Sequence, residues 1–306
     1  MFDGKFSFSG DYFYNVRSNI LVARNASVPA STGLTLPMEN IGEVVNQGFE
    51  FQFGYSNKIG AFNYTVDLNG GYQKNEIKYW DETPGVPEYQ KSTGYPMNTS
   101  LYYKAIGIFN DQAEVDGYPH WAGARPGDVI FEDVNEDGKI DGLDRVRVYR
   151  TNLPTFTGGL TFDLGYKNFY ANIFFQGATG AMRNSYYEMQ GEAGNYLVAD
   201  AEGRWTVDNP NATKPRTWNR YNEYWRNYAN TYWLQTTDYL RLKNIEIGYN
   251  LVNINSSKYV LSGLRIYFSG LNLLTFDNLK DFDPESSSGT SYPLNKVYNI
   301  GLALTF

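Results

Sequence analysis

The chain ends with the stretch Val297-Tyr298-Asn299-Ile300-Gly301-Leu302-Ala303-Leu304-Thr305-Phe306. Large apolar side chains occupy its even positions (Tyr298, Ile300, Leu302, Leu304 and Phe306), and small or polar side chains occupy most of its odd positions. Because successive side chains of a strand point to opposite faces, one face would be large and apolar. About ten residues of such alternation can cross a bilayer as a tilted strand. The stretch therefore predicts the last strand of a transmembrane β-barrel, with its apolar face towards lipid.

The same alternation recurs upstream and predicts an all-β, antiparallel protein. Asn57-Lys58-Ile59-Gly60 and Lys167-Asn168 are typical of short turns between strands. In the segment 239–251 the phase of the alternation changes near Asn244, which predicts a β-bulge. The segments expected to be strands, besides the last one, are 5–14, 49–55, 62–73, 156–166, 169–175, 239–251 and 264–268.

The connections between these strands alternate between long and short. Outer-membrane barrels combine short periplasmic turns with long external loops. Phe306 is therefore expected at the periplasmic side, and the extended pieces within 76–153 are not expected to include a single extra spanning strand. The external loops predicted on this basis are 24–47, 76–153, 177–236 and 277–296.

Composition narrows the class of protein. The 306 residues contain 0 Cys, which excludes disulfides and thiolate metal sites. The 26 basic residues are outnumbered by 33 acidic ones, so a nucleic-acid partner is not expected. The 27 Tyr, 19 Phe and 30 Gly suit aromatic girdles and packed β-structure. Residues 1–5 lack the pattern of a signal peptide, which is therefore expected further upstream.

Several motifs, taken in order, resemble the C-terminal half of SusC/RagA-type TonB-dependent outer-membrane transporters. Each motif alone is weak, but the ordered set covers essentially the whole chain. The motifs are Asn40-Ile41-Gly42, Asn46-Gln47-Gly48-Phe49-Glu50, Pro126-Gly127-Asp128, residues 133–140, Phe174-Phe175-Gln176-Gly177, Arg204-Trp205-Thr206, Tyr239-Leu240-Arg241-Leu242-Lys243-Asn244, residues 269–275, Asp281-Phe282-Asp283-Pro284-Glu285 and the terminal strand.

The resemblance implies a transporter rather than an enzyme. It implies a barrel of about 22 strands around an N-terminal plug, a TonB box coupled to the proton-motive force, and a SusD-like surface lipoprotein as partner. Glycans or oligopeptides are the usual cargo of this family, and the barrel-assembly machinery recognises a terminal strand such as 298–306. Residues 1–306 are then expected to be the C-terminal part of the barrel, without plug, TonB box or signal peptide, and not competent for import alone.

Residues 133–144 fit the spacing of a calcium-binding loop. Gly138 stands where the sharp turn needs glycine, and Ile140 stands at the inward apolar position. An acidic surface turn without metal is the alternative. The expected Ca²⁺ ligands are the side chains of Asp133, Asn135 and Asp137, the backbone carbonyl of Lys139, Asp141 through water, and Asp144.

Aromatic residues crowd one predicted external loop. Flat rings beside polar groups suit the binding of a sugar or peptide. Large loops also need small cores of their own, and packing is the favoured interpretation of these rings. The candidate ligand-binding residues are Trp205, Trp218, Tyr221, Trp225, Tyr228 and Trp233.

No catalytic constellation accompanies these candidates. His120 is the only histidine, and no G-x-S-x-G sequence is present. The alternative to a membrane transporter is a soluble or surface-attached, calcium-stabilised, β-rich protein that binds glycans or has a structural role. The two interpretations differ in one observable property, because a soluble sandwich would bury the aromatic face of each strand and a barrel would expose it as a continuous band.

Overall fold

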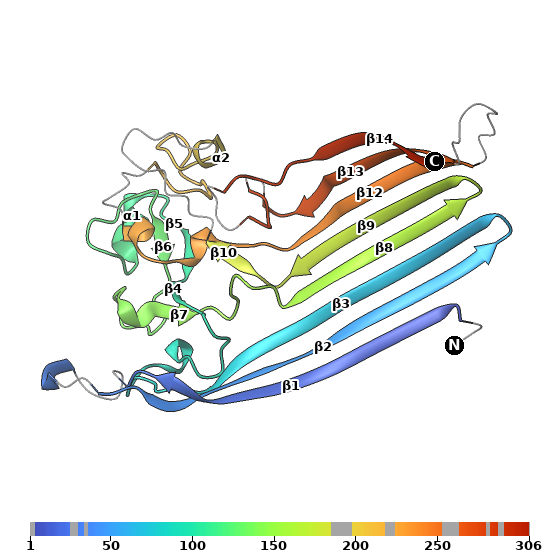
Figure 1. Cartoon of the computed structure of the whole chain (residues 1–306). Helices are drawn as coiled ribbons and strands as arrows, with labels where there is room; N and C mark the ends of the chain where they lie inside the picture. The colour runs from blue at the N-terminus through green and yellow to red at the C-terminus, as the bar shows by residue number, and fades with distance from the viewer. Residues whose placement is uncertain are drawn as a thin grey trace.

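The computed structural model describes residues 4–24, 30–33, 36–184, 198–217, 224–252, 263–279, 282–286 and 291–305. Its main element is one eight-stranded antiparallel sheet in which the strands follow one another in chain order (Figure 1). All eight predicted strands are members of this sheet, so the prediction of an all-β, antiparallel fold is confirmed. The strands are β1 (Phe6–Val22), β2 (Glu39–Ile59), β3 (Phe62–Tyr79), β8 (Phe156–Tyr166), β9 (Phe169–Thr179), β12 (Tyr239–Val252), β13 (Gly263–Asp277) and β14 (Val297–Thr305).

Short turns lie at one end of the sheet and long loops at the other. The turns after β2 and β8 contain Gly60 and Lys167, whose backbones have φ of 61° and 54°. In Figure 1, β1 begins and β14 ends at the same end as these turns. The predicted alternation of short and long connections is confirmed.

Three strands extend further into the loop region than the alternation predicts. The predicted loop 24–47 is wrong in its second half, because β2 begins at Glu39 and pairs there with β1. Val44 and Val45 are both buried although they point to opposite faces. Burial on both faces removes the period of two from the sequence, so the strand could not be recognised there. The predicted loops 76–153 and 177–236 also begin slightly later than expected, since β3 ends at Tyr79 and β9 at Thr179.

The expected β-bulge in β12 is present. The register shifts between Leu242 and Asn244 against both neighbouring strands, β9 and β13. Lys243 is the extra residue against β9, whereas against β13 the extra residue lies in β13, between Leu271 and Leu274. The bulge reverses which side chains of β12 point to each face, as the change of phase in the sequence indicates.

Large apolar side chains from all eight strands are exposed on one face of the sheet. In β14, Ile300 and Leu302 are 83% and 68% exposed. A soluble sandwich would bury these side chains, so their exposure favours the barrel. The other strands contribute to this exposed face Phe8, Tyr12, Phe49, Phe53, Phe62, Leu68, Tyr166, Phe169, Ile247 and Ile266, among others.

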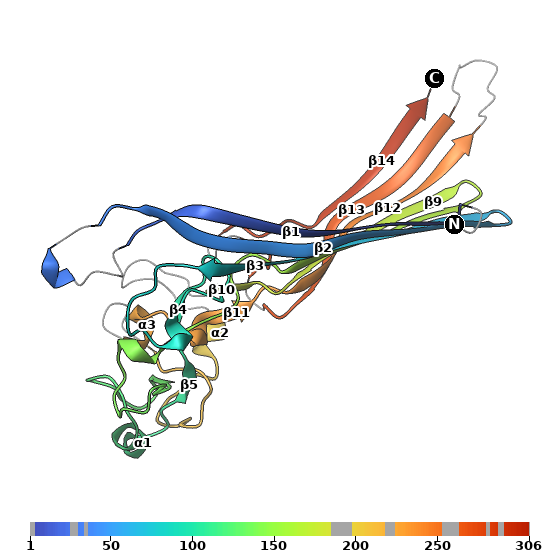
Figure 2. The ribbon, with the colours of Figure 1, turned by 90° about the horizontal axis from the view of Figure 1, so that it is seen from below.

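The sheet is open and curved. Among the described strands, β1 pairs only with β2, and β14 pairs only with β13. Figure 2 shows the curvature and shows that most loop elements lie on one side of the sheet, beyond the ends of the strands. None of the helices in the described ranges is long and apolar enough to cross a membrane.

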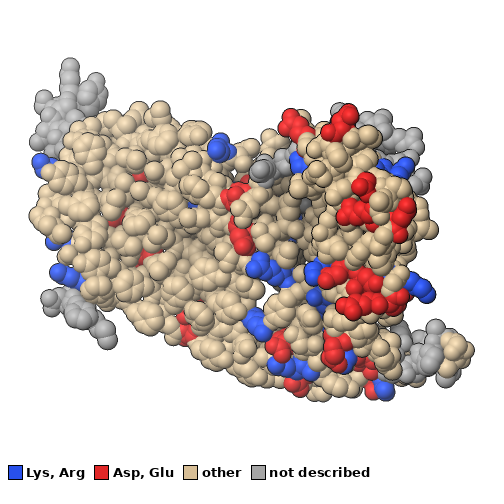
Figure 3. All heavy atoms as spheres, turned by 180° about the vertical axis from the view of Figure 1, so that it is seen from behind, with Lys and Arg blue, Asp and Glu red and all other residues tan. Residues whose placement is uncertain are grey.

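The loops carry short elements and most of the buried core. As predicted, the extended pieces within 76–153 do not span the sheet, and they form small two-stranded sheets instead. Figure 3 shows that charged side chains gather over the loop half, whereas the strand half carries few. The loop elements are η1 (Ala30–Thr32), η2 (Glu88–Gln90), β4 (Leu101–Tyr103), β5 (Ala105–Ile108), α1 (Gln112–Gly117), β6 (Val129–Phe131), η3 (Gly142–Asp144), β7 (Arg145–Arg147), β10 (Met182–Asn184), α2 (Val198–Ala201), α3 (Tyr224–Asn227), η4 (Thr231–Trp233) and β11 (Leu234–Thr236).

Candidate functional site: the inner wall and its loops

The face of the sheet opposite the exposed apolar band is a polar wall. It contains an open hollow of about 590 Å³ lined by residues of β1, β2, β3, β8 and β9. Acidic and amide side chains such as Asp11, Glu50, Asn69 and Gln176 line this hollow. A wall of this kind suits contact with water and polar solutes, as the lumen of a transport barrel requires.

Aromatic rings lie flat on this wall where glycine stands on the neighbouring strand. A Cβ atom added at Gly301 would lie 2.2 Å from Cζ of Tyr267, and one added at Gly248 would lie 2.4 Å from Cε1 of Tyr170. The Tyr170 hydroxyl donates to Oε1 of Glu246 at 2.7 Å. Glycine is needed at these positions because only a residue without a side chain leaves room for the ring.

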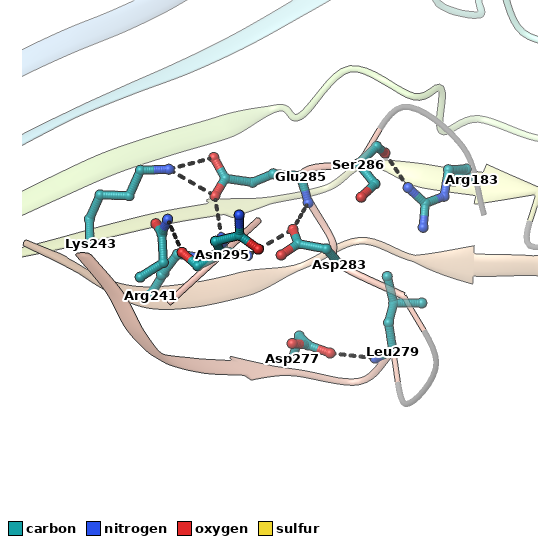
Figure 4. Close-up of polar contacts among 10 residues, drawn as sticks. Arg183, Arg241, Lys243, Asp277, Leu279, Asp283, Glu285, Ser286 and Asn295 are labelled. Carbon is teal, nitrogen blue, oxygen red and sulfur yellow. Dashed lines mark hydrogen bonds and ion pairs between the residues drawn. The ribbon is translucent and has the colours of Figure 1, made fainter. Parts of the chain in front are cut away.

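A buried ion-pair network fastens the loop after β13 to the loop-side end of β12. Nη2 of Arg241 donates to Oδ1 of Asp283 at 2.8 Å, and its Nη1 lies 3.1 Å from Oε2 of Glu285. Nζ of Lys243 reaches the same Glu285 oxygen at 3.0 Å. The Arg241 side chain is 1% exposed, and Figure 4 shows these groups converging from two segments of the chain.

This network joins two of the motifs quoted from the sequence, 239–244 and 281–285. Their mutual contact was missed at the sequence level. The contact could have been predicted from charge complementarity, because the first motif has two cations, Arg241 and Lys243, and they pair with Asp283 and Glu285 of the second. On the far side of the loop, a guanidinium nitrogen of Arg183 donates to the backbone carbonyl of Ser286, so residues 282–286 are held from two directions.

The loops enclose a hydrophobic core, here called the loop core, centred on Trp225. Beside it, the buried carboxylate of Asp128 accepts from Nε of Arg216 at 2.7 Å and from Nε1 of Trp225 at 3.1 Å. Gly127 has φ of 87° and lies against the ring of Trp205. The members of the loop core are Tyr103, Ile108, Val129, Phe131, Ile140, Trp225 and Trp233, with Ala105, Trp121, Trp205, Tyr224 and Tyr232 packed against them.

The aromatic candidates for ligand binding divide into two groups. Trp225 is fully buried and Trp233 is 8% exposed, so their rings pack inside the loop core, which was the favoured interpretation of the sequence. Tyr228 is 42% exposed, although its ring stacks on Trp121 with centroids 4.9 Å apart. Trp218 and Tyr221 lie outside the described residues.

Residues 133–144 fold as a tight loop whose carboxylates accept backbone N–H groups. Gly138 donates to Oδ2 of Asp133 at 2.9 Å, and Lys139 donates to Oδ1 of Asp137 at 3.0 Å. Gly138 has φ of 80°, which provides the expected sharp turn. Ile140 is buried in the loop core, at the inward position that the sequence predicts.

The fit of this loop to a calcium ion can be judged from its oxygen donors. Asp133, Asn135 and Asp137 supply oxygens of the kind that calcium prefers. Asp144 is fully buried, and its oxygens accept from the backbone N–H groups of Val134 at 2.8 Å and Asp141 at 2.7 Å. Across the described ranges, no group of three or more His, Cys, Asp or Glu is placed to hold a metal ion. The first half of the loop supplies oxygens of the type that calcium binds, and Asp144 braces the loop through its hydrogen bonds to the backbone.

The electrostatic field around the loop is negative. Burial, and then the nearby carboxylates of Asp144, Asp137 and Asp141, raise the pKa of Tyr89 above its ordinary value. The Tyr89 hydroxyl donates to the carbonyl of Leu143 at 2.8 Å. A cation bound in the loop would relieve this accumulation of negative charge.

The terminal strand presents the apolar face that the sequence predicts. Tyr298 and Leu304 are exposed together with Ile300 and Leu302, whereas Phe306 lies outside the described residues. The second edge of β14 has no neighbour among the described strands. An exposed apolar face suits contact with lipid, and an open strand edge can pair with a further strand.

Curated relatives match the chain over nearly its full length. TonB-dependent receptor P3 of Formosa agariphila is 29% identical over 318 aligned positions, which cover 99% of this chain and 31% of the relative. TonB-dependent receptor P26 of the same organism is 26% identical over 341 positions, which cover 100% and 33%. The chain thus spans about a third of the length of these relatives. No protein-family model matches it.

Solved structures share the fold of the whole chain. The RagAB peptide importer in its open-open state superposes with a TM-score of 0.72 at 21% identity, covering 100% of this chain and 33% of that one. The RagAB peptide transporter gives a TM-score of 0.71 at 22% identity. The chain is therefore similar to TonB-dependent receptors over its whole length, and its strands are arranged as in the matching third of the RagAB chains.

Proposed function

We propose that this chain forms the C-terminal part of the barrel of a TonB-dependent outer-membrane importer of nutrients. The observation that carries the proposal is the pairing of an exposed apolar face with a polar inner wall, in a chain whose relatives are TonB-dependent receptors. The plug, the TonB box and the remaining barrel strands belong to the upstream part of such an importer. Import then depends on TonB, on barrel-assembly machinery that recognises the terminal strand, and on a SusD-like lipoprotein over the loops.

Oligopeptides are the better supported cargo of the two classes that the resemblance implies. The structures with the same fold are described as peptide importers. The loop core also buries Trp225 and Trp233, which leaves fewer open ring faces for stacking a sugar. Among the members of the aromatic set that the structure describes, Tyr228 is the most exposed and is best placed to contact cargo.

Disruption of the gene in its natural host tests this function. Uptake of a labelled pool of oligopeptides is expected to fall to the level seen with a proton ionophore, because import through such a protein depends on the proton-motive force. A plasmid copy of the gene should restore uptake. A labelled pool of oligosaccharides serves as the second arm, and unchanged uptake of both pools in the disrupted strain would contradict the proposal.

We propose further that residues 133–144 bind calcium and rigidify the external loop. Asp137→Ala should weaken calcium binding by about tenfold or more, because it removes one carboxylate from a site expected to bind in the range of about 0.1–1 mM. Isothermal calorimetry of the full-length protein in detergent measures the effect. Glu136→Gln is the matched control, since it removes one charge from the same exposed turn without removing a proposed ligand. Equal calcium heats for the two variants would contradict calcium binding at Asp137.

A further inference from the structure

Two hollows that share lining residues lie on the loop side of the molecule. The first has a volume of about 620 Å³ and lies between residues of β1, β2 and β3 and residues 149–155. The second, of about 420 Å³, lies between residues 98–102 and β10. Arg150 and Thr151 line both hollows, and the two hollows together are here called the basic track.

The charged side chains that line the basic track are positive, whereas the chain as a whole is negative. Arg17, Lys74 and Arg150 line the first hollow, and Arg150 and Arg183 line the second, while neither lining includes an Asp or Glu. The chain as a whole has a formal net charge of −7. In Figure 3, Lys and Arg atoms are visible at the boundary between the strand half and the loop half. Positive charge along these hollows would attract an anion in an otherwise acidic protein.

Several of these cations have unused hydrogen-bonding capacity. Arg17 and Arg150 are exposed, and neither forms an ion pair with another described residue. Arg183 donates to the carbonyl of Ser286, but its Nη2 atom is buried without a hydrogen-bond partner among the described residues. Lys74 is the exception, because its Nζ lies 3.3 Å from Oε2 of Glu76. Guanidinium groups with free N–H donors are well suited to binding carboxylates in pairs of hydrogen bonds.

The residues that line the hollows favour an acidic peptide over an acidic sugar as the ligand. Nζ of Lys74 covers the ring of Tyr149 at 5.2 Å, and Tyr95 lies against the same ring with centroids 5.8 Å apart. These rings therefore offer little free surface for stacking a sugar.

Amide side chains also line both hollows. Asn98, Asn152 and Asn184 line the second hollow. Each amide has both a donor and an acceptor, which can pair with the N–H and C=O groups of a peptide backbone.

From this arrangement we infer that the basic track binds the acidic side chains of an oligopeptide, with Arg150 contacting carboxylates from both hollows. This inference rests on the proposed import function and specifies its substrate as peptides rich in Asp and Glu. Binding to the purified protein requires neither TonB nor an energised membrane. A failure of binding can therefore be distinguished from a failure of import.

Fluorescence anisotropy with labelled tetraglutamate and the full-length protein in detergent tests the inference. Tetraglutamate should bind the wild-type protein more tightly than tetraglutamine, and 500 mM salt should weaken its binding, since salt screens exposed charges. Arg150→Gln should weaken tetraglutamate binding by about tenfold, as expected for the loss of charge-assisted hydrogen bonds. Lys58→Gln is the matched control, because it removes one exposed positive charge at the turn end of β2 and should leave binding unchanged.

Three results would overturn the inference. The first is equal binding of tetraglutamate and tetraglutamine to the wild-type protein. The second is wild-type affinity of the Arg150→Gln variant for tetraglutamate. The third is tighter binding of trigalacturonate than of tetraglutamate, which would assign the basic track to an acidic sugar. Import of neutral peptides alongside any of these results would leave the import function intact.

Discussion

Replacement of Arg241 by methionine should cost about 3–5 kcal/mol of folding stability. The substitution removes a guanidinium that is 1% exposed, and it leaves the side chains of Asp283 and Glu285, which are 12% and 22% exposed, without their main counter-charge. Buried charges that lose their partner are costly because the protein interior solvates them poorly. The expected result is a loss of order in residues 282–286, measured as faster amide hydrogen exchange there and a lower midpoint of thermal unfolding.

Lys243→Met provides the matched control for this prediction. Nζ of Lys243 pairs with the same Glu285, but its side chain is 27% exposed, and an ion pair of that kind contributes about 0–1 kcal/mol. Combining Arg241→Met with Asp283→Asn and Glu285→Gln should recover part of the stability, because the combination removes the buried anions together with the cation. Equal losses for Arg241→Met and Lys243→Met would contradict a special role for the buried network.

The eight strands could be predicted because one face of each is apolar and the other is polar. Residues 156–166 alternate except at Gly158, and β8 spans the same residues. The alternation fails at Val44 and Val45, which are buried on opposite faces beyond the exposed apolar band. Apolar and polar residues alternate with a period of two only when the two faces of a strand lie in different environments. A strand that is buried on both faces therefore shows no such alternation in its sequence.

The site could be predicted only in its local parts. The turn at Gly138 and the inward position of Ile140 follow from spacing within a single loop. The contact between Arg241 and Asp283 spans 42 residues of sequence, and the basic track draws its cations from four separate segments. Spacing along the chain carries no information about which distant segments meet, and only the sheet order and the path of the loops bring them together.

Asp128→Ala should unfold the loop core while the sheet remains folded. The carboxylate of Asp128 is fully buried and accepts from Arg216, Trp225 and the backbone N–H of Arg125. Its removal should cost about 3–5 kcal/mol, because the Arg216 guanidinium, which is 13% exposed, loses its carboxylate inside the protein. Tryptophan fluorescence should shift to longer wavelength as Trp225 and Trp205 become hydrated, and limited proteolysis should cut between residues 198 and 233.

The sheet should survive this change because its strands are held by their own ladder of hydrogen bonds, whereas the loop core depends on packing around Trp225. Asp128→Asn should have a smaller effect, since the amide oxygen can still accept from Nε1 of Trp225 while the charge is lost. Glu132→Gln is the surface control, because Glu132 pairs with Lys104 at 2.6 Å and the two side chains are 36% and 53% exposed. The same proteolysis pattern for Asp128→Ala and Glu132→Gln would contradict this prediction. It would mean that the Asp128 carboxylate does not stabilise the loop core and that apolar packing alone keeps the core folded.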